Sequence, residues 1–303
     1  MIQALCALAI GGNLVSIVVV SHHGFQETTN IVVTSLAVCD LAYSLTNCLY
    51  AMRSVLGRFD TPLSSTFSSY YVVYVFPWNQ WSLACSVGHV TIIALERMLA
   101  VCFPFRVSTI VTARRMTAAV ISVYICNLLM SIPLHLIFDF EWVASGQNAS
   151  YAALSENQFY SDNSELMNFF LSVVFSNLAL TLPLVVVFVC TSTTIVKITV
   201  NRRHIQMSLT AASCRRRDQK AVKSLLTVCV VFLVVVAPSS VYNVYAAVGP
   251  DSSVLSGEFK ILVALVQGLL YQTSATVNFF IYLRTSSKFA GTYKALFCFG
   301  YNL

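Results

Sequence analysis

Charged residues are scarce in this chain. They make up 10% of its 303 residues, whereas hydrophobic residues make up 57%, and the mean hydropathy is +0.75. A soluble domain needs roughly a quarter of its residues to be charged in order to coat its surface. The composition therefore excludes a soluble protein of this size and predicts an integral membrane protein that is largely covered by lipid.

The sequence also lacks the motifs of the common enzyme classes. It has no His-Glu-x-x-His, no Gly-x-Ser-x-Gly and no P-loop. An intramembrane aspartyl protease needs two carboxylates, but Asp40 is the only acid deep in an apolar stretch. A transporter would show repeated halves or broken helices, and neither is apparent. No cysteine pair has the spacing of zinc ligands. We expect no enzyme and no cofactor apart from the cation considered below.

Seven apolar stretches are long enough to cross about 30 Å of hydrocarbon as helices, which takes roughly 20 residues. They are too long and too evenly apolar for the strands of a membrane barrel. The seven stretches cover approximately residues 1–20, 30–52, 68–95, 115–138, 166–196, 221–248 and 259–283. We predict an all-α seven-helix bundle that forms one domain over residues 1–303, with polar loops at 139–165 and 201–220.

The distribution of basic residues gives the orientation of the bundle. Fifteen of the 18 fall on one side of the seven stretches, and only Arg53, Arg58 and Lys260 fall on the other. The crowded side is predicted to be cytoplasmic, so the N-terminus lies outside. Its basic residues suit anionic lipid headgroups, and nucleic acid is not implied. A cleaved signal peptide at residues 1–20 would invert this arrangement, and the stretch has no basic region before it.

Three polar side chains interrupt the spans, and such groups are costly in lipid unless they find a partner. Asp40 lies in the second span, Asn13 in the first and Asn278 in the last. We expect them to meet inside the bundle. For Asn13 we favour a hydrogen-bond clamp between helices, whereas for Asp40 a cation or proton site is an equal alternative.

Two positions are candidates for modification. Asn148 begins the acceptor tripeptide Asn-Ala-Ser in a loop assigned to the outside, which predicts glycosylation. Cys298 follows a short amphipathic stretch on the cytoplasmic side, where it is either a palmitoylation site or an unmodified thiol. The outer loops contain no cysteine, so an extracellular disulfide framework is excluded.

Seven short motifs follow one another in a fixed order along the spans. They are Gly12-Asn13, Leu36 to Asp40 (LAVCD), Glu96-Arg97-Met98, Pro183, Phe232, Pro238 and Asn278 to Tyr282 (NFFIY). In this order they resemble the motifs of rhodopsin-like (class A) G-protein-coupled receptors, over essentially the whole chain. The resemblance implies a receptor of the plasma membrane that couples to heterotrimeric G proteins, with a short eighth helix at about 286–298.

The resemblance implies roles for the charged pair at the end of the third span. In this family the arginine, here Arg97, is held by its neighbouring acid, Glu96, and by an acid at the start of helix 6, here Asp218. An agonist parts helices 3 and 6, so that the arginine contacts the G protein while Tyr282 swings inward. Arg97 would thus have two states, held and released, and a ligand shifts the equilibrium between them when it binds one state more tightly.

Asp40 and its expected neighbours resemble the sodium site of the family. Oxygen ligands would come from Asp40 together with Ser86, Ser274 and Asn278, with Asn13 close by. A sodium ion bound there would be an allosteric ligand and not a catalytic cofactor.

Several positions depart from the family pattern. Val236 stands at the helix-6 tryptophan, Thr191 at the helix-5 tyrosine and Val72 at the helix-3 cysteine, and helix 4 lacks its tryptophan. The chain also begins within the first span. These departures indicate a divergent receptor or a truncated gene model. They leave a non-signalling scaffold receptor as an alternative function, and a small membrane transporter as a second, weaker alternative.

The candidate ligand pocket is aromatic and rich in amides. Asn79 stands where amine receptors carry aspartate, and Gln272 stands where opsins carry the retinal lysine, which argues against an amine receptor and a photoreceptor. The lining consists of Phe76, Trp78, Asn79, Trp81, Tyr242, Asn243, Gln267, Tyr271 and Gln272. It suits a peptide or a neutral polar small molecule, and ordinary aromatic packing is the alternative for each residue singly.

A narrower resemblance comes from the first and second cytoplasmic connections. The stretches HGFQETTNIVVTSLAVCDL and CFPFRVSTIVTARR, together with the missing disulfide, resemble invertebrate orphan receptors. Among these they resemble molluscan chemosensory-type receptors and FMRFamide-like peptide receptors.

Overall fold

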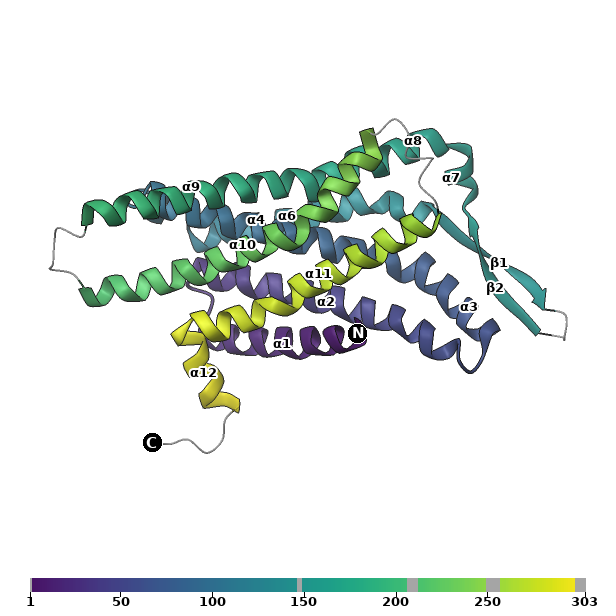
Figure 1. Ribbon diagram of the computed structural model, residues 1–303, viewed down its shortest axis with the longest axis horizontal. Coiled ribbons are helices and arrows are strands. Elements are labelled where there is room, and N and C mark those ends of the chain that lie inside the picture. Colours follow the sequence, from purple (N-terminus) through teal and green to yellow (C-terminus); the bar gives the residue numbers. More distant parts are fainter. Residues whose placement is uncertain (1, 146–148, 206–211, 249–256, 298–303) are drawn as a thin grey trace.

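The computed structural model describes the backbone of residues 2–145, 149–205, 212–248 and 257–297 (Figure 1). It describes their side chains except those of residues 145, 149, 201–224, 246–248, 257, 258, 260 and 261. The predictions for Asn148 and Cys298, and for the side chain of Asp218, lie outside the described residues.

Long helices run side by side along one direction and form a bundle (Figure 1). The first two are α1 (Ile2–His22) and α2 (Thr28–Leu56). The third span combines α3 (Thr61–Tyr70), the π-helical turn η1 (Tyr71–Val75) and α4 (Phe76–Cys102). After the short α5 (Val107–Ile110), the fourth span consists of α6 (Ala113–Ser131) and the 3-10 turn η2 (Ile132–Leu136).

The second half of the chain completes the bundle. The fifth span combines α8 (Ser164–Phe169), the π-helical turns η3 (Phe170–Phe175) and η4 (Asn177–Thr181), and α9 (Leu182–Ile205). It is followed by α10 (Ala212–Val248), α11 (Gly257–Thr285) and the short α12 (Ser287–Phe297). Six helical segments among the described residues are long and apolar enough to cross a membrane, and α11 packs between α1 and α10 as a further long helix. The chain is a multi-pass membrane protein.

Two of the π-helical turns, η1 and η4, have a local cause in the sequence. η1 ends at Val75, two residues before Pro77, and η4 ends at Thr181, two residues before Pro183. Proline has no backbone N–H, so a carbonyl one turn earlier loses its donor and the local hydrogen-bond pattern changes. Such changes in winding are a known cause of bends in long helices.

Two glycines allow close helix packing. A Cβ atom on Gly12 would lie 3.0 Å from the Cβ of Phe279, so this glycine lets α1 approach α11. A Cβ atom on Gly88 would lie 2.7 Å from a methyl group of Val123, which brings α4 against α6. Small residues at such crossings are typical of membrane bundles, where close van der Waals contact supplies much of the association energy.

The side of the bundle that the sequence assigns to the outside carries a hairpin where we predicted a polar loop. Residues Phe138–Ser145 (β1) and Ala149–Glu156 (β2) pair as an antiparallel hairpin, followed by the short α7 (Gln158–Asp162). The hairpin lies at the end of the bundle next to α3, and α12 lies at the opposite end (Figure 1). The prediction of a short eighth helix is confirmed, since α12 buries Phe289 against Phe279 and Tyr282. The assignment of residues 1–303 to a single domain stays a prediction.

Candidate functional site

The inner ends of α2 and α4 meet in a buried charged cluster. Arg97 Nη2 lies 3.0 Å from Glu96 Oε1 and donates a hydrogen bond to Thr29 Oγ1 at 2.7 Å. Glu96 Oε1 also accepts hydrogen bonds from Thr28 Oγ1 at 2.6 Å and from Thr29 Oγ1 at 3.2 Å. The side chains of Arg97 and Glu96 are only 12% and 5% exposed. The pair therefore neutralises itself in a site with little water and anchors α4 to the first turn of α2.

The cluster leaves some hydrogen-bonding capacity unused. Among the described residues, Glu96 Oε2 and Arg97 Nε have no hydrogen-bond partner. Buried groups of this kind are normally satisfied. The two threonines were not predicted from the sequence, because a hydroxyl at the start of an apolar helix is a common N-terminal feature with no signal of its own.

Asp40 lies at the centre of the bundle and is 2% exposed. Its Oδ1 accepts a hydrogen bond of 2.6 Å from Ser86 Oγ on α4, and its Oδ2 accepts one of 2.8 Å from Asn278 Nδ2 on α11. Asn13 instead donates to the carbonyls of Ala9 and Ala275, at 2.9 and 3.1 Å. Asp40 and Asn278 thus meet as expected, whereas Asn13 bonds to the backbone of α11.

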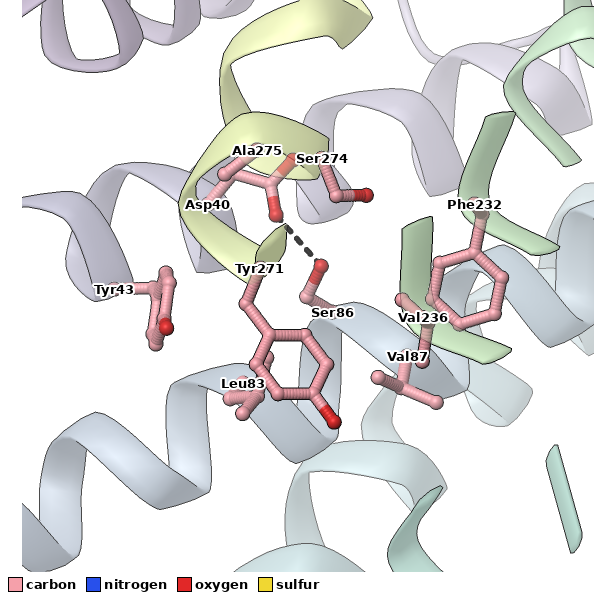
Figure 2. Close-up of a pocket in the computed structure, with 10 residues that line it drawn as sticks. All are labelled: Asp40, Tyr43, Leu83, Ser86, Val87, Phe232, Val236, Tyr271, Ser274 and Ala275. Atoms are coloured by element: carbon pink, nitrogen blue, oxygen red, sulfur yellow. Dashed lines mark hydrogen bonds between the residues drawn. The ribbon is translucent and has the colours of Figure 1, made fainter. Parts of the chain in front are cut away.

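A small cavity opens beside Asp40 (Figure 2). The space open to the centre of a water molecule is about 10 Å³, which is about enough for one water. Figure 2 shows Ser86 bonded to Asp40 and the hydroxyl of Tyr271 pointing away from that carboxylate. The cavity is lined by Asp40, Tyr43, Leu83, Ser86, Val87, Phe232, Val236, Tyr271, Ser274 and Ala275.

The ring of Tyr271 borders this cavity together with Val236, the residue at the usual tryptophan position. Val236 is fully buried and Tyr271 is nearly so. Within the described part of the chain, the hydroxyls of Tyr271 and Ser239 make no hydrogen bond of normal geometry, but they lie near enough to interact with each other.

The amides of the predicted ligand pocket are largely engaged with one another or with neighbouring helices. Asn79 donates to Thr46 Oγ1 at 2.7 Å. Gln272 accepts from Asn47 at 3.2 Å and donates to Ser44 Oγ at 2.9 Å, and it is fully buried. These bonds tie α2 to α4 and to α11, so both amides support the pocket wall in this conformation.

The outer part of the predicted pocket is less enclosed. Gln267 Nε2 donates to Asn243 Oδ1 at 3.1 Å and to the Ser239 carbonyl at 3.3 Å, which links α10 to α11. Phe76 and Tyr242 are half-buried.

A second buried polar cluster joins α2, α4 and α6. His89 is fully buried, its Nε2 lies 2.8 Å from Ser35 Oγ, and Ser35 Oγ lies 2.7 Å from the Tyr124 hydroxyl. Cys39 Sγ donates to the Tyr124 hydroxyl at 3.3 Å. We did not predict this cluster, because a single histidine in an apolar helix does not reveal which residues of other helices it will meet.

The inner end of the bundle is also joined to α12. Lys288 Nζ lies 2.8 Å from Glu27 Oε1, and His23 Nε2 lies 2.8 Å from Thr292 Oγ1. Partial burial, followed by the nearby positive charge of Lys288, holds the pKa of His23 below its ordinary value of 6.5. The lowered pKa favours the neutral imidazole, which can share a hydrogen bond with Thr292.

The outer loops carry mainly negative charge. Their exposed side chains include the acids Asp60, Asp139, Glu141, Glu156, Asp162 and Glu165, against the bases Arg53 and Arg58. The charged cluster of Glu96 and Arg97, the polar core around Asp40 and the acidic outer rim thus lie in order along the bundle. Such an arrangement suits a receptor that transmits a change from one side of a membrane to the other.

Comparison with known proteins agrees with this reading. Residues 11–282 match the model of the family described as "7 transmembrane receptor (rhodopsin family)". The chain belongs to this family, and it is a G-protein-coupled receptor and not an enzyme.

Two relatives align along nearly the whole chain. The chain is 24% identical to an allatostatin-A receptor of Bombyx mori, over 95% of this chain and 76% of the relative. It is also 24% identical to somatostatin receptor type 5 of Bos taurus, over 97% of this chain and 74% of the relative. A probable G-protein-coupled receptor of Caenorhabditis elegans is 21% identical over 44% of this chain and 31% of the relative.

Proposed function

We propose that this receptor resides in the plasma membrane with its N-terminus outside and responds to an extracellular peptide. The observation that carries the proposal is the alignment, over almost the whole chain, with two receptors named for the peptides allatostatin A and somatostatin. The acidic outer rim supports it, since complementary charge would steer a peptide with basic residues toward the bundle. A neutral polar small molecule is the alternative ligand.

In the proposed mechanism, the cluster of Glu96, Arg97, Thr28 and Thr29 holds the inactive state. Ligand binding among the outer ends of α4, α10 and α11 favours a conformation in which α4 and α10 part and Arg97 is released to the G protein. A ligand shifts this equilibrium only by its difference in affinity for the two states. Asp218 on α10 would add a second partner for Arg97 in the inactive state.

We also propose that the polar core binds sodium in the inactive state. The residues fit such an ion, because Asp40 is a buried carboxylate whose hydrogen-bond donors among the described residues are the neutral Ser86 and Asn278, and an uncompensated buried charge is costly. Asp40, Ser86 and Ser274, which all carry side-chain oxygens, line one cavity. When bound, the cation supplies the missing positive charge and favours the conformation in which these oxygens converge.

A peptide screen in cells that express promiscuous G-protein α-subunits tests the function. Allatostatin-A and somatostatin peptides serve as the first probes, followed by peptides rich in basic residues. We expect agonist-driven nucleotide exchange for one class and none in the Arg97→Ala receptor. Activation by a neutral small molecule alone would contradict the peptide assignment. Peptide binding without exchange would favour the scaffold receptor, which the small residues Val236 and Thr191 at two switch positions support.

The orientation has a separate test. A tag inserted within residues 206–211 should react with antibody only after the cells are permeabilised, whereas a tag before residue 1 should react on intact cells. The opposite pattern would reverse the bundle and remove the basis for the proposed function. Glycosylation at Asn148, measured by glycosidase sensitivity, would place the hairpin side outside.

A further inference from the structure

The hairpin β1–β2 is attached to α3 through one residue of its second strand. The backbone N–H of Ala152 donates to Thr66 Oγ1 at 3.1 Å, and the carbonyl of Ala152 accepts from Ser69 Oγ at 2.8 Å. Ala152 is fully buried and Ser69 is 4% exposed. Both backbone groups of Ala152, which would otherwise be unpaired at the edge of a two-stranded sheet, are therefore satisfied by the helix.

The sequence of α3 explains why two hydroxyls reach the same strand residue. Thr66 and Ser69 are three residues apart, so they lie on one face of the helix, about one turn apart. The helix begins with the side chain of Asp60, which accepts a hydrogen bond from the backbone N–H of Leu63, and with Pro62 in its first turn. These features stabilise the first turn of α3.

Aromatic side chains join the other strand to the same span. The ring centroids of Tyr70 and Phe140 are 4.8 Å apart, and those of Tyr74 and Phe140 are 6.4 Å apart. Phe140 also contacts Trp142 at 6.4 Å on the same face of β1. The hairpin is therefore held by two hydroxyls on β2 and by ring contacts on β1.

The sequence offers no disulfide that could hold the hairpin to the third span. Val72 stands at the helix-3 position of the family's cysteine, one turn after Ser69, and no cysteine occurs between residues 49 and 84 or between residues 127 and 189. We propose that Thr66 and Ser69 are positioning residues that clasp the outer hairpin to the third span without a disulfide. The clasp fixes the hairpin beside the outer mouth of the bundle, where the proposed function places ligand entry.

Hydrogen exchange of the full-length receptor, in detergent or nanodiscs, tests the clasp without any ligand. In the double variant Thr66→Val/Ser69→Ala, we expect peptides that cover residues 149–156 to exchange about 10- to 100-fold faster, since two buried hydrogen bonds are lost. The variant Thr66→Ser keeps a hydroxyl and should exchange like the wild type. A reducing agent should not change the exchange of the wild-type hairpin.

The matched control is Ser65→Ala/Ser68→Ala, which removes two hydroxyls from neighbouring positions of α3 that make no hydrogen bond to the hairpin in the described structure. It should leave residues 149–156 unchanged. Exchange of peptides from α4 reports whether each variant folds. If the α4 peptides of the double variant also exchange faster, the single variants Thr66→Val and Ser69→Ala are measured in its place. Unchanged hairpin exchange in a folded clasp variant, or equal acceleration by the control, would overturn the proposal. Failure to find an agonist would leave this readout unaffected.

Discussion

The contact between Glu96 and Arg97 gives the most direct test of the inner cluster. The variant Glu96→Gln keeps the size of the side chain and one acceptor oxygen, but it removes the negative charge that faces Arg97 across 3.0 Å. We expect the cluster to loosen. Arg97 would then leave the first turn of α2 more often, and basal nucleotide exchange would rise in the absence of any agonist.

The size of the effect follows from the environment of the pair. Hydrogen bonds between charged groups contribute about 1.5–3 kcal/mol, and neutral ones about 0.5–1.5 kcal/mol. The substitution leaves Thr28 and Thr29 in place, and Arg97 is 12% exposed, so we expect a loss of about 1–2 kcal/mol. This corresponds to a shift of roughly 5- to 30-fold in the equilibrium between the held and released states.

Two measurements report the loss. Basal exchange of a non-hydrolysable GTP analogue should rise in membranes that contain Glu96→Gln. The apparent melting temperature of the purified receptor should fall by roughly 2–6 °C, because the held state is the one that loses the interaction. Melting is informative even if the cognate G protein is absent from the assay.

The matched control is Glu27→Gln, at the same end of the bundle. Glu27 pairs with Lys288 at 2.8 Å, but both side chains are largely exposed, and surface ion pairs contribute little. It should leave both basal exchange and the melting temperature nearly unchanged. If Glu96→Gln behaves like this control, the inner cluster does not hold the inactive state and the reasoning is wrong.

Three further predictions concern the remaining parts of the site. Arg97→Ala should abolish agonist-driven nucleotide exchange while surface expression stays largely intact, as measured on the same cells; unchanged exchange would refute its role. Asp40→Asn should remove any sodium sensitivity of agonist affinity, and a salt response equal to that of the wild type would reject the cation site. Because the pKa of His23 is lowered in the folded state, docking of α12 should be complete above about pH 6.5 and weaken as the pH falls through that lowered pKa. Amide exchange of residues 287–297, corrected for its intrinsic pH dependence, measures this weakening. It should be absent in His23→Gln, which keeps a neutral donor toward Thr292.

The bundle was predictable because its main signal is local in the sequence. Each span is a long apolar stretch, and a helix is the structure in which such a stretch satisfies its own backbone in lipid. The ends of the helices were harder to predict from the sequence. α10 begins at Ala212, nine residues before the predicted start of its span, because a helix continues into water beyond the apolar segment that identifies it.

The hairpin was missed although its signal is present. Residues Phe138 to Trp142 alternate between aromatic and acidic side chains, which is the period of a strand with one buried face. Hydropathy averages this alternation away, so the segment looks like a polar loop. Its docking on α3 depends on Thr66 and Ser69, more than 80 residues away from Ala152, and nothing local connects them.

In the candidate site too, some residues could be predicted from the sequence, whereas their partners on other helices could not. Ser86, Asn278 and Asp40 were brought together by resemblance to a family, since hydrophobic pattern alone does not say which helices are neighbours. Thr28 and Thr29 have no motif, and their role appears only once α2 and α4 are placed side by side. Resemblance therefore found the residues whose types are shared with relatives, whereas the structure found the partners that are particular to this chain.

The departures from the family pattern differ in kind, and this difference bears on whether the receptor signals. Where the framework has lost a side chain, other polar groups take its place: Thr66 and Ser69 hold the hairpin without a disulfide, and Tyr124 with His89 links α6 to its neighbours without a helix-4 tryptophan. At the helix-6 position, Val236 leaves no aromatic ring, and the adjoining cavity is bordered instead by the ring of Tyr271. In a receptor that had only lost contacts, we would not expect other polar groups to join the helices in their place. We therefore expect a folded receptor whose activation depends more on release of Arg97 than on a ring in helix 6, which is why Glu96→Gln separates a signalling receptor from a scaffold.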